Sequence, residues 1–218
     1  PVPVLDRVPL VAQLLALGEA EGDLRAAVDP VHGERHQRVA LALDGAEEMI
    51  EFATVGREGT TGIPIIHGLD EANLALVSQL PGQSLRIRTA ELVAAVRRFP
   101  ALAEVLRTYG GVMFAFLAQS AACNRAHIVD ERLARWLLMT HDQAGGDDFQ
   151  ITQEFLAQML GVSRPSVALS AAVLHKAGLI RYHRGEMTIT DRGGLEAAAC
   201  ECYGVIRSQF DRIRKLKH

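Results

Sequence analysis

The apolar residues between positions 151 and 174, ITQEFLAQMLGVSRPSVALSAAVL, recur at the spacing of two short amphipathic helices. Thr152 is suited to cap the first helix, because its hydroxyl accepts a hydrogen bond from a free backbone N–H. Gly161 is suited to end that helix in the left-handed conformation, with Val162 buried in the corner. The inward positions are Phe155, Leu156, Met159 and Leu160 in the first helix and Val167, Ala171 and Leu174 in the second. This pattern predicts a helix-turn-helix.

The second helix begins at Ser163, and Arg164, Ser166 and Ser170 form its polar face. A glycine corner between two helices also occurs in ordinary all-α proteins, so the segment that follows is informative. Residues 181–190, RYHRGEMTIT, have the pattern of two strands around a glycine turn, which predicts a winged helix-turn-helix. Arg181, His183 and Arg184 of this wing would contact phosphates, or would form the solvated face of an edge hairpin.

Residues 37–90 alternate short apolar segments with turn signals, which is typical of an antiparallel β domain. The expected strands are 38–43, 49–55, 74–80 and 84–88. The first thirty residues instead have helical spacing, with apolar positions at Leu10, Leu14, Leu15 and Leu17. We therefore expect a helical element followed by a β domain.

Thr89 is suited to cap a helix over residues 90–99, and Pro100 marks a new start. Residues 101–127 then predict one long helix. An apolar seam with alternating steps of three and four residues runs along it and is typical of a dimerisation helix. Its positions are Leu102, Val105, Tyr109, Val112, Phe116, Gln119 and Cys123. The alternative is that this seam packs on the chain's own β domain, and a wider apolar surface allows both. Gly110 and Gly111 would permit a bend or a close approach.

Charge is distributed unevenly: residues 1–130 hold 11 basic and 16 acidic residues, and residues 131–218 hold 12 and 10. The basic excess coincides with the predicted winged helix-turn-helix, as expected for an acidic sensory half joined to a DNA-contacting half. We find no uninterrupted apolar run of membrane-spanning length and no leader, so we expect a cytoplasmic protein without a membrane partner. Paired carboxylates in a pocket and a nucleophile elbow are also lacking, so we expect no enzyme.

The order of β domain, long helix and winged helix-turn-helix resembles the Crp/Fnr family of bacterial transcription regulators. The resemblance begins near Met49 and is most specific in GREGTTGIP (56–64), CNRAHIVDERLARWLL (123–138) and TQEFLAQMLGVSRPSV (152–167). It implies an α+β fold: a jelly-roll-like antiparallel β-roll sensor domain (1–98), a dimerisation helix (99–130) and a winged helix-turn-helix domain (131–218). It also implies a homodimer that binds a two-fold symmetric site in double-stranded DNA and contacts RNA polymerase.

The effector site departs from the family pattern. Relatives that bind cyclic AMP hold it with a Gly-Glu pair and an Arg-Ser pair, and the matching positions here are Gly62-Ile63 and Asn73-Leu74. A buried phosphate without its cation is costly, so we predict a degenerate sensor domain that does not respond to cyclic AMP. The β segment is also short for a complete jelly roll, so the domain is either reduced or partly missing from the sequence. The effector itself stays unknown.

The cysteines are Cys123, Cys200 and Cys202, so the N-terminal cluster of the family's iron–sulfur sensors is absent. We expect Cys200 and Cys202 to lie in a helix as small buried apolar residues, because no histidine pair is close to them in sequence. His32 and His36 would share a helix face but have no third ligand. The sequence therefore predicts no metal and no cofactor.

The resemblance places Arg164, Pro165 and Leu169 where relatives have Arg, Glu and Arg on the recognition helix. Only Arg164 is able to make a bidentate contact with guanine, so the DNA site should differ from that of the cyclic-AMP regulator. The other expected DNA-binding residues are Ser163, Ser166, Ser170, Thr152, Gln153 and Arg184. The alternative function is a winged-helix protein-interaction module that does not bind DNA.

Overall fold

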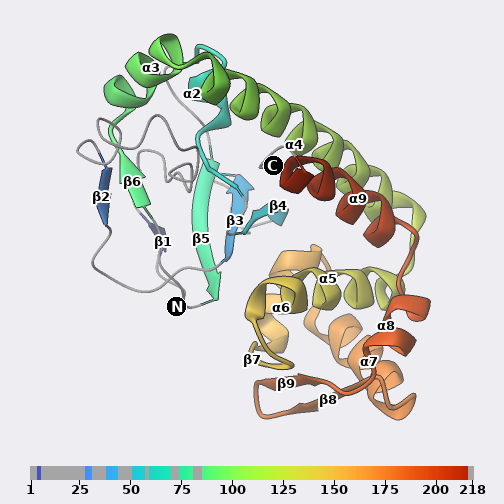
Figure 1. The fold of residues 1–218 in the computed structure, drawn as a ribbon. Helices are drawn as coiled ribbons and strands as arrows, with labels where there is room; N and C mark the ends of the chain where they lie inside the picture. Colours follow the sequence, from blue (N-terminus) through green and yellow to red (C-terminus); the bar gives the residue numbers. More distant parts are fainter. Residues whose placement is uncertain are drawn as a thin grey trace. The chain divides into compact units, whose positions relative to one another are not determined.

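The computed structural model describes residues 4–5, 28–30, 38–43, 51–56, 59–69, 74–80 and 85–215 (Figure 1). The chain divides into two compact units. One comprises residues 1–44, 53–116 and 208–218, and the other comprises residues 45–52 and 117–207. The boundary at residues 116 and 117 falls inside the long helix α4 (Pro100–Ala126). The division therefore falls within a helix.

The described strands before residue 88 form two sheets. One sheet has the order β1 (Val4–Leu5), β5 (Leu74–Leu80), β3 (Arg38–Leu43) and β4 (Glu51–Val55). The other pairs β2 (Val28–Pro30) with β6 (Leu85–Ile87). The sequence predicted β3 and β5 with the observed bounds, and β4 and β6 within two residues at each end. These sheets and the helices confirm the α+β class, whereas the jelly-roll arrangement stays a prediction.

The helical spacing of the first thirty residues was misleading where the structure describes them. Val4–Leu5 and Val28–Pro30 are strands, paired with β5 and β6. The four leucines that suggested the helix, and also His32 and His36, lie outside the described residues. Strand pairing at these two sites overrides the local helical pattern, because backbone hydrogen bonds to distant strands are invisible to a local period.

The helices of the first unit surround a small apolar core. They are α2 (Ile63–Ile66), α3 (Thr89–Arg98) and the first part of α4. Ile87, Leu92, Ala95, Leu102 and Leu106 are buried together, with Phe99 packed against them. Helix α3 begins one residue earlier than expected, because Arg88 is its N-cap and Thr89 lies in the first turn. The hydrophobic core of this unit therefore depends on residues of α3 and α4 together.

The predicted dimer seam of α4 is wrong as an exposed surface. Its positions Leu102, Tyr109, Val112, Phe116 and Cys123 are buried within the chain, and Val105 is half-buried. Phe116 packs edge to face on Phe210 of α9 (Cys202–Lys215), with ring centroids 5.7 Å apart. The seam packs on the chain itself, but only its N-terminal part, at Leu102, clusters with a strand residue, Ile87 of β6. Phe116 and Cys123 instead meet Phe210 and Cys200, so the expected packing on the β domain is observed only in part. Large apolar side chains are buried wherever the chain offers them a partner.

Helix α4 is the one helix in the described residues that is long and apolar enough to cross a membrane by length and composition. The sequence analysis found no uninterrupted apolar run here, because Glu104, Arg107 and Arg125 interrupt the segment. Its side chains Leu106, Tyr109, Met113 and Phe116 are all buried in the protein. The most apolar window of this helix is 39% buried in the protein, and the core helix of a soluble protein passes the same test of length and composition.

The second unit is a helical domain with a small sheet. Its elements are α5 (Val129–Ala144), β7 (Asp148–Gln150), α6 (Gln153–Leu160), α7 (Arg164–Lys176), β8 (Ile180–His183), β9 (Glu186–Ile189), α8 (Arg192–Ala198) and the start of α9. The antiparallel sheet has the order β7-β9-β8, so the predicted wing gains a third strand. Trp136 of α5 is buried and contacts Phe155 edge to face. Helix α5 is thus the platform on which the other helices pack.

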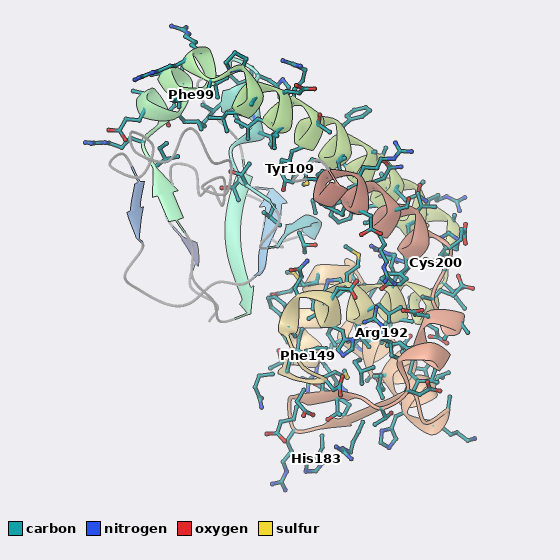
Figure 2. The ribbon with its side chains drawn as sticks, in the orientation of Figure 1. Phe99, Tyr109, Phe149, His183, Arg192 and Cys200 are labelled. Carbon is teal, nitrogen blue, oxygen red and sulfur yellow. The ribbon has the colours of Figure 1, made fainter. Side chains whose placement is uncertain are left out.

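Arg192 connects the helices that close this unit. Its guanidinium donates to Asp142 of α5 at 2.7 Å and to the hydroxyl of Tyr203 of α9 at 2.6 Å, and it pairs with Glu196 at 3.0 Å (Figure 2). Tyr203 in turn donates to Asp142 at 3.0 Å. Burial, together with the charge of Asp142, raises the pKa of Tyr203 to about 12. The tyrosine therefore stays a neutral donor at physiological pH.

The cysteines are buried, as the sequence predicted, but Cys200 does not lie in a helix. It occupies the corner between α8 and α9, and α9 begins only at Cys202. Its Sγ lies 3.6 Å from Sγ of Cys123 in α4. The hydrogen bond between the two thiols is the main reason that the pKa of Cys123 is lowered to about 5. The same hydrogen bond raises the pKa of Cys200.

Candidate nucleic-acid interface

Helix α6 begins and ends at the residues that the sequence predicted. The backbone N–H of Phe155 donates to Oγ1 of Thr152 at 3.1 Å, which makes Thr152 the N-cap. Gly161 ends the helix with φ 61, a left-handed conformation that favours glycine. Val162 follows with a half-buried side chain, less enclosed than expected. The corner between α6 and α7 is therefore fixed by local chemistry.

Ser163 caps helix α7. Its Oγ accepts from the backbone N–H of Ser166 at 3.4 Å and lies 2.9 Å from Oγ of Ser166. Pro165 occupies the first turn, where a missing N–H costs no hydrogen bond. Arg164 is exposed beside it. The N-terminus of α7 therefore presents a guanidinium to solvent on a capped and rigid first turn.

The inward face of α7 matches the predicted stripe, since Val167, Ala171 and Leu174 are buried. Ser170, predicted to face DNA, is also buried, and its hydroxyl donates to Oδ1 of Asp130 at 2.5 Å. The prediction for Ser170 is therefore wrong. The serine hydroxyl suggested a polar surface position, but its place between Val167 and Leu174 in the helical period turns it toward α5.

The exposed face of α7 also carries apolar residues. Leu169 is 70% exposed and Val173 is 47% exposed, and Ala172 beside them is exposed as well. Large apolar side chains that are exposed to water near a binding residue indicate a contact surface, because exposure to water is unfavourable for them. In a major groove, apolar side chains contact the methyl group of thymine. The sequence analysis placed Leu169 on the recognition helix but gave it no role.

The wing is a tight β-hairpin between β8 and β9. Its two turn residues, Arg184 and Gly185, have φ 49 and φ 88. Positive φ at both central positions is what a type I′ turn requires. The side chains of Arg181, His183 and Arg184 are exposed, and His183 lies at the end of β8 in Figure 2. The hairpin therefore presents basic side chains at its tip.

A hydrogen bond joins the wing to the segment before α6. The hydroxyl of Tyr182 donates to the carbonyl oxygen of Ile151 at 3.1 Å. Burial raises the pKa of Tyr182, so this hydroxyl remains a donor. Of the predicted DNA-binding residues, only Ser170 is buried; the exposed or half-buried ones are Thr152, Gln153, Ser163, Arg164, Ser166 and Arg184. The geometry thus offers side chains from α6, α7 and the wing.

The predicted effector positions are only partly visible. Gly62 has φ 78 and caps α2, and Ile63 is the half-buried first residue of that helix. The short helix α2 follows Gly62 directly. Asn73 lies outside the described residues, and Leu74 begins β5. Gly62-Ile63 offers no carboxylate for a ribose hydroxyl.

Comparisons with known proteins agree with this geometry. Residues 131–198 match the family model of the Crp-like helix-turn-helix domain. No curated protein matches the sequence. Solved structures show that the chain has the fold of Crp/Fnr regulators.

Three of these solved structures illustrate the likeness. One is a Crp/Fnr-family transcriptional regulator from Eubacterium rectale, with TM-score 0.66, 14% identity, and coverage of 82% of this chain and 92% of that one. A CooA mutant from Carboxydothermus hydrogenoformans has TM-score 0.61, 15% identity, and coverage of 89% and 97%. A Crp/Fnr-family regulator from Thermus thermophilus has TM-score 0.58, 18% identity, and coverage of 91% and 94%.

Proposed function

We propose that this Crp/Fnr-type chain is a DNA-binding transcription regulator that acts as a homodimer and does not respond to cyclic AMP. The observation that carries the proposal is the exposed Arg164 on the capped first turn of α7, within a winged helix-turn-helix. In this fold the N-terminal part of the second helix reaches base edges in the major groove. We infer that the protein acts in the cytoplasm with RNA polymerase and has no catalytic activity.

The contacts with bases come from α7. Arg164 makes the bidentate contact with O6 and N7 of guanine that only a guanidinium fork supplies. Leu169 and Val173, which are exposed beyond it on the same helix, contact thymine methyl groups. We therefore expect each half-site to contain a guanine that contacts Arg164 and a thymine that contacts Leu169 or Val173. Ser163 and Ser166 are engaged with each other at 2.9 Å and contribute little specificity.

Contacts with phosphates come from the start of α6 and from the wing. Thr152 and Gln153 lie where free backbone N–H groups of a helix N-terminus favour an anion. Arg184 projects from the type I′ turn of the wing, with Arg181 exposed on β8. Such contacts position the protein and give a salt-dependent affinity, but they do not read sequence.

The homodimer forms through the face of α4 that the chain leaves exposed. Gly111, Phe114, Ala118 and Ala121 are exposed or nearly so on this face, with steps of three, four and three residues. Phe114 is 74% exposed, and a Cβ added to Gly111 would meet nothing within 4 Å. Alternating steps of three and four with small residues allow two helices to pack closely. A two-fold dimer would bind half-sites about 34 Å apart, one turn of DNA.

The sensor unit lacks the cyclic-AMP chemistry at the positions where relatives carry it. Ile63 replaces the carboxylate for the ribose, and Asn73 replaces the arginine for the phosphate. An unpaired buried phosphate is strongly disfavoured. We therefore expect cyclic AMP to leave the melting temperature and the DNA affinity unchanged. A cyclic-AMP-dependent rise in either quantity would contradict this part of the proposal.

The test is selection of bound sequences from random DNA with the full chain. We expect a two-fold symmetric site, and a salt-dependent affinity that falls steeply between low and physiological salt. Arg164→Ala should weaken binding to the selected site by about 1 to 3 kcal/mol and relax the preference for one guanine, with non-specific binding nearly intact. Leu169→Ala should relax a thymine position instead.

Arg97→Ala is the matched control, because Arg97 is an exposed arginine on α3 outside residues 131–198. Its affinity and sequence preference should equal those of the unmodified protein. If the selection enriches no sequence and no gel shift occurs at low salt, the chain is instead a winged-helix protein-interaction module.

A further inference from the structure

Four side chains with metal-binding atoms meet within the unit that contains residues 117–207. Cys123 lies in the last turn of α4, and His127 follows directly after the helix, its N–H donating to the carbonyl oxygen of Cys123 at 3.1 Å. Cys200 and Cys202 lie at the corner between α8 and α9, where Figure 2 labels Cys200. One ligand atom from each of the four residues lies within 4.8 Å of the other three. No other group of this kind occurs in the described residues.

The distances fit the coordination shell of a single ion. Sγ of Cys123 lies 3.6 Å from Sγ of Cys200, and Sγ of Cys202 lies 3.7 Å from Nδ1 of His127. Bond lengths of about 2.3 Å for Zn–S and about 2.0 Å for Zn–N in a tetrahedron separate two sulfurs by about 3.8 Å and sulfur from nitrogen by about 3.5 Å. Three thiols and one imidazole are a ligand set typical of structural zinc.

The surroundings also resemble those of a metal site. Cys123, Cys200 and Cys202 are buried together as one cluster. Nε2 of His127, the nitrogen that does not face Cys202, lies 3.2 Å from a carboxylate oxygen of Glu201. A carboxylate on the outer nitrogen is the arrangement that orients metal-bound histidines. Nε2 of Gln119 donates a hydrogen bond to Sγ of Cys202 at 3.0 Å. A thiolate that is bound to a metal is able to accept such a bond from a neighbouring N–H group.

Two buried arginines supply the charge that such a complex needs. Zn²⁺ with three thiolates and a neutral imidazole carries one negative charge. Arg132 and Arg135 of α5 are 7% and 6% exposed, and Nε of each is buried without a hydrogen-bond partner. The charge of Arg135 acts on Cys123, and the charges of Cys123 and Cys200 act on Arg132. Buried guanidinium groups are costly unless an anion compensates them, and a thiolate complex provides that anion.

We propose that Cys123, His127, Cys200 and Cys202 bind one Zn²⁺ in a structural site that joins the end of α4 to the start of α9. On binding, the thiols that are still protonated lose their protons to solvent, and Nδ1 of His127 bonds to the ion while Nε2–H donates to Glu201. Protein ligands fill all four positions, so the site holds structure and has no place for a substrate. The sequence analysis set metal aside because no histidine pair is close to Cys200 and Cys202 in sequence, and His127 reaches them only in the folded chain.

A disulfide and an iron–sulfur cluster are the rival uses of these thiols. A disulfide between Cys123 and Cys200 requires the sulfurs to approach to about 2.05 Å, and it leaves Cys202, His127 and both arginines unexplained. A cluster of several iron atoms needs its ligands farther apart than the single sphere of 4.8 Å that these atoms share. One ion accounts for all four residues and for their charged neighbours.

The test is the metal content of the full chain, purified under reducing conditions without chelator. We expect one zinc per chain by elemental analysis. After removal of zinc with a chelator, titration with Co²⁺ alone should give the visible absorption of tetrahedral cobalt with thiolate charge transfer, saturating at one equivalent and reversed by Zn²⁺. The melting temperature should rise with added Zn²⁺, because the ion binds the folded state.

Variants locate the ion. His127→Ala and Cys202→Ser should each abolish stoichiometric zinc, and Glu201→Gln should lower the Zn²⁺ affinity about 10- to 100-fold. His175→Ala, at an exposed histidine of α7 outside the cluster, should retain one zinc. The cobalt titration uses the unmodified chain, so it decides the matter even where a cysteine variant does not fold.

Two results would overturn the proposal. One is a reduced protein that neither retains zinc nor binds added Zn²⁺ or Co²⁺. The other is iron with acid-labile sulfide, or a disulfide between Cys123 and Cys200, as the state of the purified chain. None of these measurements involves DNA, so their outcome is independent of the proposed regulatory function.

Discussion

Helices α4 and α7 each have one apolar face and one more polar face. The sequence analysis assigned the apolar face of α7 to the core of the chain and that of α4 to a second subunit. On α7 the predicted stripe is buried and the opposite face presents Arg164. On α4 the predicted stripe is also buried, although it was assigned to a second subunit. The exposed face of α4 is made of small residues around Phe114. The richest apolar stripe therefore marks the chain's own core, and the proposed dimer surface is on the poorer face.

The two phenylalanines of α4 provide the sharpest test of this contrast. Phe116→Ala should lower the free energy of unfolding by about 3 to 5 kcal/mol, because the ring is buried against Phe210. Phe114→Ala should change it by less than about 0.5 kcal/mol at a concentration where the chain is monomeric. Urea unfolding measures both values. Sedimentation should show a weaker dimer for Phe114→Ala alone, and equal unfolding effects would refute the assignment of the two faces.

The two serines of α7 extend the comparison to the DNA-binding unit. Ser170→Ala should cost about 1.5 to 3 kcal/mol of stability, because Asp130 loses its hydroxyl donor. Its sequence preference for DNA should be unchanged. Ser166→Ala, at a half-buried position of the same helix, is the control and should cost about 0.5 kcal/mol or less. Thermal unfolding and a competition gel shift measure the two quantities; a changed base preference in Ser170→Ala would restore that residue to the interface.

The N-cap of α6 tests how much a purely local hydrogen bond contributes to the stability of the protein. Thr152→Ala should lower the free energy of unfolding by about 1 kcal/mol, since the N–H of Phe155 loses its acceptor. Thr152→Ser retains the hydroxyl and should restore most of that loss. Denaturant titrations of the three proteins decide this, and identical midpoints would show that the cap contributes nothing.

The adjacent glycines of α4 give the smallest effect. Gly111→Ala should raise the stability of the monomeric chain by about 0.5 to 1 kcal/mol, because its Cβ points into open space and alanine favours helix. Gly110→Ala should bring no such gain, because its Cβ would lie 2.6 Å from Nε2 of His67. Thermal unfolding at low protein concentration compares them. A gain for Gly110→Ala equal to that for Gly111→Ala would contradict the assigned orientation of the helix.

The sequence by itself determined the helix-turn-helix, because its signals are local. Thr152, Gly161 and Ser163 act through hydrogen bonds and φ values within their own turns, and the structure confirms each of them. Strands β3 and β5 were equally readable, since short apolar runs between turn signals define them. The resemblance to Crp/Fnr regulators also rests on such short segments, among them residues 152–167 of the helix-turn-helix.

Only the tertiary structure decided which partner each face meets. The helical period of α4 predicted an apolar stripe but not which segment packs on it. The polar side chain of Ser170 suggested an exposed position, because the sequence does not show its hydrogen bond to Asp130, 40 positions away. The meeting of Cys123 and His127 with Cys200 and Cys202 is a contact across more than 70 positions, with nothing local to announce it. Periodicity tells how a side chain is directed from its own helix, whereas contacts between distant segments depend on how the whole chain packs.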